Sequence, residues 1–99
     1  MSGDTLVRER FRIDAGHPSL PGHFPGNPVV PGVVLLDRVA AAIERADAGP
    51  LRRIAAVKFL APVLPGDDIE CVVTRDGERV RFHALRGDVV VLRGDGALA

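Results

Sequence analysis

The sequence is poor in aromatic residues and in cysteine, and it carries no excess of charge. Its 99 residues include four Phe but no Trp or Tyr, so a platform for stacking nucleic-acid bases is not expected. Its 13 basic and 13 acidic side chains give a formal net charge of zero, which argues against a general attraction to nucleic acid or to an anionic membrane. The one cysteine, Cys71, cannot form an internal disulfide and is expected to be a small buried residue in a reducing compartment.

Long apolar runs are missing too. The first residues, MSGDTLVRERFRID, are too charged for a signal peptide, and no run approaches the length needed to span a membrane. We therefore expect a cytoplasmic protein with no membrane partner. The length predicts a single domain, residues 1–99, whose small core would gain from dimerisation.

The pattern of apolar residues predicts an α+β protein. Residues 5–13 alternate between apolar residues and arginines, which is typical of a half-buried strand with an arginine row facing out. A long loop rich in Pro and Gly follows. Residues 33–49 are apolar on nearly all sides, so they predict a helix that begins near Gly32 and is buried on most faces.

After Pro50 the chain is expected to form antiparallel strands. We expect these strands at 51–63, 69–75, 78–86 and 89–93, joined by turns at PGD, DG and GD. The tail GDGALA is expected to fray. A single helix that is apolar all round needs a sheet wrapped around it, and a second subunit would close five short strands better than one chain can.

Three residues between the loop and the helix could carry chemistry. His23 lies between prolines in the loop, and an imidazole there could act as a general base. The N–H groups of Gly32 and Val33 lack intrahelical partners at the helix start, where they suit a developing oxyanion. Asp37 follows an apolar run, where a carboxylate is costly unless it is paired or its pKa rises, and one reading is a functional acid at a pocket. The other reading is a helix tilted so that Asp37 and Arg38 reach water.

These residues lie in a stretch that resembles a known family. GHFPGNPVVPGVVLLD, residues 22–37, is similar to the signature of hot-dog-fold 3-hydroxyacyl-[acyl-carrier-protein] dehydratases of the FabA/FabZ group. FLAPVLPGDDIECVV, residues 59–73, resembles the same family's strand-turn-strand segment. The short chain looks most like the small ApeI-like branch of aryl-polyene and related pigment pathways.

The resemblance implies a fold and a set of roles. It implies an antiparallel sheet wrapped around one helix, with His23 taking the C2 proton and Asp37 assisting loss of the hydroxyl as water. It implies that the N–H of Gly32 binds the thioester carbonyl, with Val33 and Phe24 beside it in the substrate site. In the family the histidine and the acid meet across a dimer interface. The family usually has Gln four residues after the acid, where this chain has Ala41.

The resemblance also implies the partners. The substrate would arrive on the phosphopantetheine of an acidic acyl carrier protein, and no other cofactor is expected. A basic landing patch could be formed by Arg8, Arg10, Arg12, Arg52 and Arg53. The spacing of the three histidines and the cysteine suggests no metal site.

Two other functions remain open at this point. One is a hot-dog thioesterase, in which Asp37 would activate water. The other is a non-catalytic hot-dog subunit that binds acyl chains in a heteromer and completes a partner's site. His83 lies on a strand with Arg79 and Arg81 on its side, and is expected at the surface.

Overall fold

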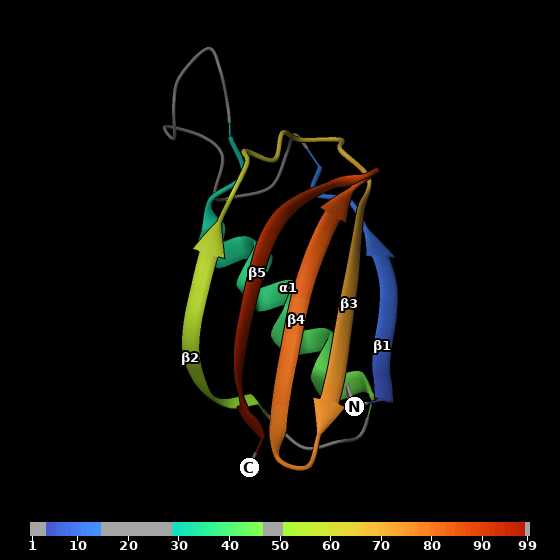
Figure 1. Ribbon diagram of the computed structural model, residues 1–99. Helices are drawn as coiled ribbons and strands as arrows, with labels where there is room; N and C mark the ends of the chain where they lie inside the picture. Colours follow the sequence, from blue (N-terminus) through green and yellow to red (C-terminus); the bar gives the residue numbers. More distant parts are fainter. Residues whose placement is uncertain (1–3, 15–28, 47–50, 99) are drawn as a thin grey trace.

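One helix packs against a five-stranded antiparallel sheet (Figure 1). The structure is a computed structural model, and it describes residues 4–14, 29–46 and 51–98. The elements in chain order are β1 (Asp4–Phe11), α1 (Gly32–Arg45), β2 (Leu51–Phe59), β3 (Ile69–Asp76), β4 (Arg79–Arg86) and β5 (Val89–Leu98). The α+β class and the sheet-around-helix arrangement predicted from the sequence are confirmed.

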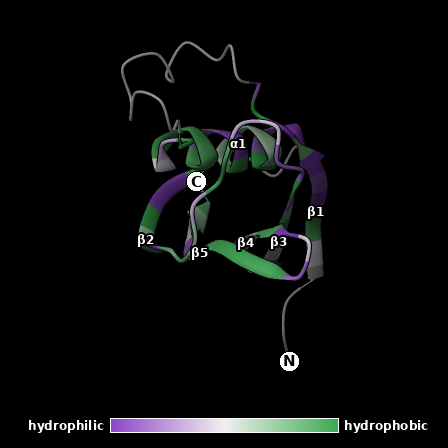
Figure 2. Ribbon diagram, turned by 90° about the horizontal axis from the view of Figure 1, so that it is seen from above, coloured by the Kyte–Doolittle hydropathy of each residue, from purple (hydrophilic) through white to green (hydrophobic). Residues whose placement is uncertain are grey.

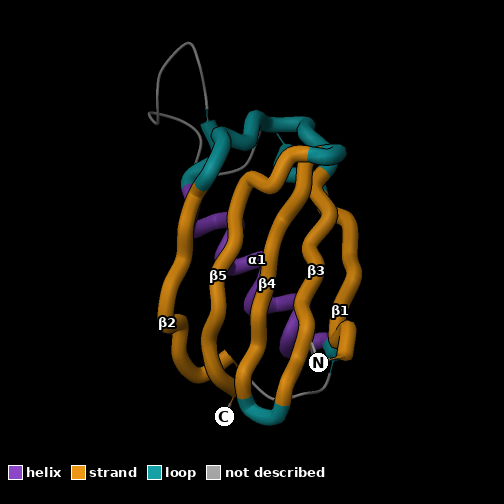
Figure 3. Tube along the Cα trace, in the orientation of Figure 1, coloured by secondary structure: helices purple, strands orange, loops and turns teal. Residues whose placement is uncertain are grey.

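The strands lie in the order β1-β3-β4-β5-β2, so that β1 and β2 form the two edges (Figure 3). The hairpins β3-β4 and β4-β5 turn at the predicted DG and GD pairs. Gly77 and Gly87 adopt φ of 61° and 60°, which a residue without a Cβ adopts at little cost. β2 ends at Phe59, four residues before the predicted end at Val63. The segment after Phe59 contains Pro62, which disfavours a longer strand.

The helix packs on one face of the curved sheet, and its apolar stripe forms the core (Figure 2). The buried helix residues are Val34, Leu35, Val39, Ala42 and Ile43. They meet the sheet residues Val73, Val80, Phe82, Ala84 and Leu92, which are also buried. The helix is not buried on most faces within this chain, because Val33 is 64% exposed and Asp37 and Arg38 lie on the open side.

The tail does not fray, and this corrects the sequence-based expectation for GDGALA. β5 continues through it to Leu98, pairing with both β2 and β4. The glycines that suggested a loose end allow close packing instead. A Cβ at Gly94 would lie 2.5 Å from the Ala56 carbonyl oxygen and 2.7 Å from Cζ of Phe82.

The edge strand β1 is fastened to the end of the helix. Arg45, in the last helical turn, donates hydrogen bonds to Glu9, with its Nε 3.2 Å from Oε1. The Arg38 guanidinium carbon lies 5.5 Å from the centroid of the Phe11 ring.

Cys71 is buried in β3, as expected, and burial raises the pKa of its thiol to about 11. Within the described ranges, no helix has the length and apolarity to cross a membrane.

Candidate active site at the start of the helix

The first turn of α1 is held by backbone hydrogen bonds rather than by a capping side chain. Pro31 is the N-cap residue, with φ −60° and ψ 142°, and its carbonyl accepts from Val34 N–H at 3.0 Å. The preceding residue, Val30, donates to the Val63 carbonyl at 2.8 Å. No hydrogen bond from Gly32 or Val33 N–H to another described residue is present. Among the described residues, these two donors at the positive end of the helix dipole have no partner.

An apolar pocket of about 780 Å³ opens at this helix start. Its walls come from the segment before the helix, from the first helical turns and from the chain just after β2. The lining includes Val30, Gly32, Val33, Leu36, Phe59 and Leu60. A pocket of this lining suits the hydrocarbon part of an acyl ligand, while the two backbone donors suit a polar oxygen at its mouth.

The ring of Phe59 lies directly against Gly32. A Cβ placed on Gly32 would be 2.6 Å from both Cε1 and Cζ of that ring, so only glycine fits without moving it. Phe59 itself is 52% exposed, although it faces the helix side of the sheet. The sequence analysis did not single out Phe59, and its position in the FLAPVLPGD segment was the signal that could have identified it.

Asp37 lies one turn after Val33 on the open side of the helix. Its side chain is exposed, and it makes no ion pair with any residue in the described part of the chain. Within one chain, Asp37 and Arg38 therefore reach water, as the second reading of the sequence allowed.

Of the other predicted site residues, two lie outside the described part of the chain and two lie within it. His23 and Phe24 lie outside the described residues, so the meeting of His23 with Asp37 stays a prediction. Gly32 and Val33 lie where the sequence predicted, at the start of the helix. Within residues 4–14, 29–46 and 51–98, no three His, Cys, Asp or Glu side chains gather as a metal ion would need.

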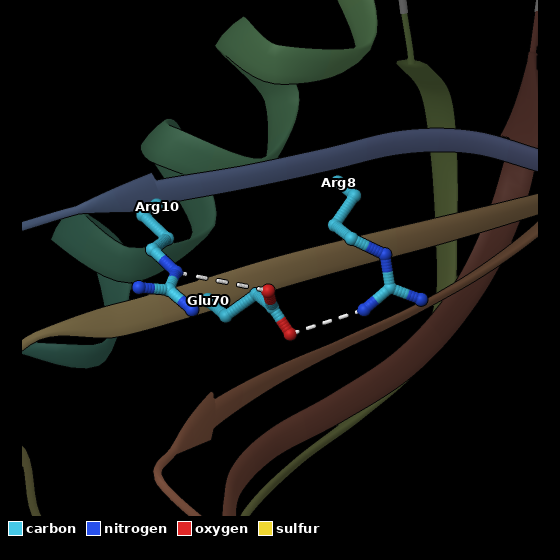
Figure 4. Close-up of polar contacts among 3 residues, drawn as sticks. All are labelled: Arg8, Arg10 and Glu70. Carbon is cyan, nitrogen blue, oxygen red and sulfur yellow. Dashed lines mark hydrogen bonds and ion pairs between the residues drawn. The ribbon is translucent and has the colours of Figure 1, made fainter.

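The predicted basic patch is only partly available. Arg8 and Arg10 both reach Glu70, with nitrogen–oxygen distances of 3.1 and 3.9 Å (Figure 4). Arg12 pairs with Asp68 at 2.6 Å. The arginine row of β1 is therefore largely compensated by carboxylates of β3 and the turn before it. Arg52 and Arg53 are exposed on β2.

Sheet order, the single helix and the pocket at its start define a hot-dog fold of the dehydratase and thioesterase class. Residues 2–94 match the ApeI-like family, described as ApeI dehydratase. The chain is 33% identical over 107 residues to the 3-hydroxyacyl-[acyl-carrier-protein] dehydratase FabZ of Allorhizobium ampelinum, covering 99% of this chain and 68% of that protein. The chain thus belongs to the ApeI-like dehydratase family.

Solved structures agree on the fold. The dehydratase heterocomplex ApeI:P from Xenorhabdus doucetiae superposes with a TM-score of 0.79 at 23% identity, covering 98% of this chain and 97% of that chain. An uncharacterized protein from Erwinia carotovora subsp. atroseptica superposes with a TM-score of 0.77 at 26% identity, covering 100% and 97%. The likeness to these chains extends over nearly their whole length.

Proposed function

We propose that this protein is a 3-hydroxyacyl-[acyl-carrier-protein] dehydratase that converts a 3-hydroxyacyl thioester to a trans-2-enoyl thioester and water. The match to the ApeI-like family over residues 2–94 carries the proposal. The apolar pocket at the helix start supports it, because this pocket combines room for an acyl chain with two backbone donors that have no partner among the described residues. Fatty acid or aryl-polyene-type biosynthesis is the process in which we place the reaction.

The proposed reaction is an elimination that needs one base and one acid. The imidazole of His23 removes the C2 proton, and the electron pair forms the C2–C3 double bond as the C3–O bond breaks. Asp37 delivers a proton to the departing hydroxyl, which leaves as water. The Gly32 N–H, with Val33 beside it, stabilises negative charge on the thioester oxygen. Phe24 is assigned to the substrate site on the family resemblance alone.

A second subunit is part of the proposal. Three apolar side chains are exposed along the β2 edge and at the helix start: Val33, Ile54 and Phe59. An open edge strand flanked by such residues is a surface that another chain would cover. A dimer built there would enclose Asp37, and a histidine from the partner could then reach it.

A heteromer is the second candidate. The relative from Xenorhabdus doucetiae is a dehydratase heterocomplex, and the present chain has Ala41 where its family usually has Gln. In that case the chain would bind acyl chains and complete the site of another hot-dog subunit. Light scattering of the purified chain separates the two: a stable homodimer favours the first candidate, and a monomer favours the second.

The test of the function is mass spectrometry on an acyl carrier protein loaded with 3-hydroxyacyl chains of several lengths. The wild-type protein should remove one water from the bound chain, and the His23→Ala variant should not. Release of free acid would show a thioesterase instead. No change at any chain length would exclude a dehydratase that works without a partner.

A further inference from the structure

A row of basic side chains crosses the face of the sheet that points away from the helix. The strand register places Lys58 of β2 beside Arg93 of β5, and Arg93 beside His83 of β4. The same row continues through Val72 of β3 to Arg8 of β1. In Figure 3 this face of the sheet points toward the viewer, and the helix lies behind the sheet. The neighbouring row adds Arg81, which lies opposite Asp95 in the strand register.

The two ends of this row differ in how their charge is balanced. At the β1 end, Glu70 pairs with both Arg8 and Arg10 and balances part of their charge (Figure 4). At the β2 end, the one carboxylate, Asp95, binds Arg79 at 3.1 Å. Lys58, Arg81 and Arg93 form no ion pair with any residue that the structure describes. A chain with zero net charge thus concentrates unbalanced positive charge on one part of one face.

These three residues line a groove of about 720 Å³ on β2, β5 and β4, together with His83 and with Asp95, the carboxylate that pairs with Arg79. We call it the basic groove and define it by Lys58, Arg81, His83 and Arg93. Apolar side chains such as Val90 line the space between the charges. Leu60, just after β2, lines both this groove and the apolar pocket at the helix start. The basic groove and the apolar pocket therefore meet at the end of β2.

We propose that the basic groove is the docking surface for the acidic carrier protein that delivers the thioester; the proposal rests on the function proposed above. Charge complementarity selects an acidic partner, and like charges exclude a second copy of this face. Because Leu60 lines both the groove and the apolar pocket, a partner in the groove lies next to the pocket. This favours a carrier protein that delivers an acyl chain over other polyanions. A carrier seated in the groove has its prosthetic arm beside the end of β2, and the arm reaches the pocket by passing Leu60.

The test compares two double variants that each remove two positive charges. Lys58→Ala/Arg93→Ala removes two positive charges from the groove and leaves Arg81, whereas Arg10→Ala/Arg12→Ala removes two from β1. We expect the groove variant to raise KM for the carrier-bound 3-hydroxyacyl substrate about tenfold at low salt, and the β1 variant to change it by less than about twofold. Both variants should turn over a 3-hydroxyacyl pantetheine thioester, which has no carrier, at the wild-type rate.

Each other outcome overturns the docking surface. An unchanged KM in the groove variant, or a rise only in the β1 variant, would place the carrier elsewhere. An equal loss on the pantetheine thioester would show a structural or catalytic role for Lys58 and Arg93. If the wild type turns over neither substrate, the proposed function fails, and binding of the fluorescently labelled unloaded carrier protein decides the surface. The same variants titrated with vesicles of anionic lipid and with duplex DNA show whether the groove serves those partners instead.

Discussion

The Phe59 ring lies across the first residue of the helix, so close to Gly32 that a single added carbon would sit 2.6 Å from two ring atoms. The contact joins the end of β2 to the turn whose N–H groups are proposed to bind the thioester oxygen. Because Phe59 is half-exposed, its ring can swing away when pushed. A change at Gly32 should therefore act on the site more than on the fold.

Gly32→Ala tests that relationship. The methyl group should displace the Phe59 ring, which is half-exposed and can move outward, so thermal stability should change little. We expect kcat/KM to fall about tenfold or more, because the ring and the new methyl disturb the oxyanion donors. Adding Phe59→Leu should recover part of the loss, with the single Phe59→Leu variant as the control. Strictly additive effects would show that the two positions are not coupled.

Asp37→Asn tests the proposed acid. The exposed side chain makes no ion pair with a described residue, so its replacement should leave the melting temperature nearly unchanged. Without a transferable proton, kcat should fall about 10²- to 10⁴-fold. Glu44→Gln is the matched control, because Glu44 is an exposed acid two turns further along the same helix. Similar kinetics for the two variants would remove Asp37 from the mechanism.

Gly94→Ala tests the packing of the C-terminal strand. The new methyl group would collide with the Ala56 carbonyl oxygen on β2 and with the Phe82 ring in the core. We expect a loss of about 1–3 kcal/mol in the free energy of unfolding, measured by urea denaturation. The neighbouring Arg93→Ala, on the exposed face, should shift it by no more than about 0.5 kcal/mol. An unchanged midpoint for Gly94→Ala would mean that β5 does not pair with β2 in solution.

The pair between Glu9 and Arg45 gives a pH dependence with a defined sign. The hydrogen bond from Arg45 holds the pKa of the Glu9 carboxyl below its ordinary value of 4.5. The folded state therefore binds fewer protons than the unfolded state near that pH, so the pair stabilises above it and is lost as the pH falls through the folded-state pKa. Glu9→Gln should lower Tm by about 3 °C or less at pH 7. In strong acid the difference from the wild type should vanish, and a constant difference would contradict the assignment.

The sequence predicts most of the fold because turn residues and alternation mark it clearly. Val80, Phe82 and Ala84, in the predicted strand 78–86, alternate with polar residues and all point into the core. The prediction was wrong for the tail GDGALA, because glycine occurs both in frayed ends and where two strands pack closely. Gly94 and Gly96 read as a loose end, yet each removes a Cβ where another strand's backbone approaches. That approach depends on a partner strand some forty residues away, which no local pattern reveals.

The site is predicted less completely, for a physical reason. The sequence places Gly32 and Val33 at a helix start correctly, because local signals define that start. It leaves open whether Asp37 reaches water or a pocket, because a local pattern does not show what packs over the outer face of the helix; in the structure its side chain is exposed. The charge on β1 was overestimated because the paired Glu70 lies on a strand that is distant in sequence. The basic groove was missed because its residues come from three strands.

The central claim is that each active site takes its histidine and its acid from two different chains. Equal amounts of His23→Ala and Asp37→Asn, each inactive alone, should be unfolded together and refolded to exchange subunits. Half of the dimers would then be hybrids with one intact site in two, so about a quarter of the wild-type dehydration rate should return. If hybrid dimers form, as native mass spectrometry would show, and no activity returns, the histidine and the acid of a site lie on the same chain and this account of the site is wrong.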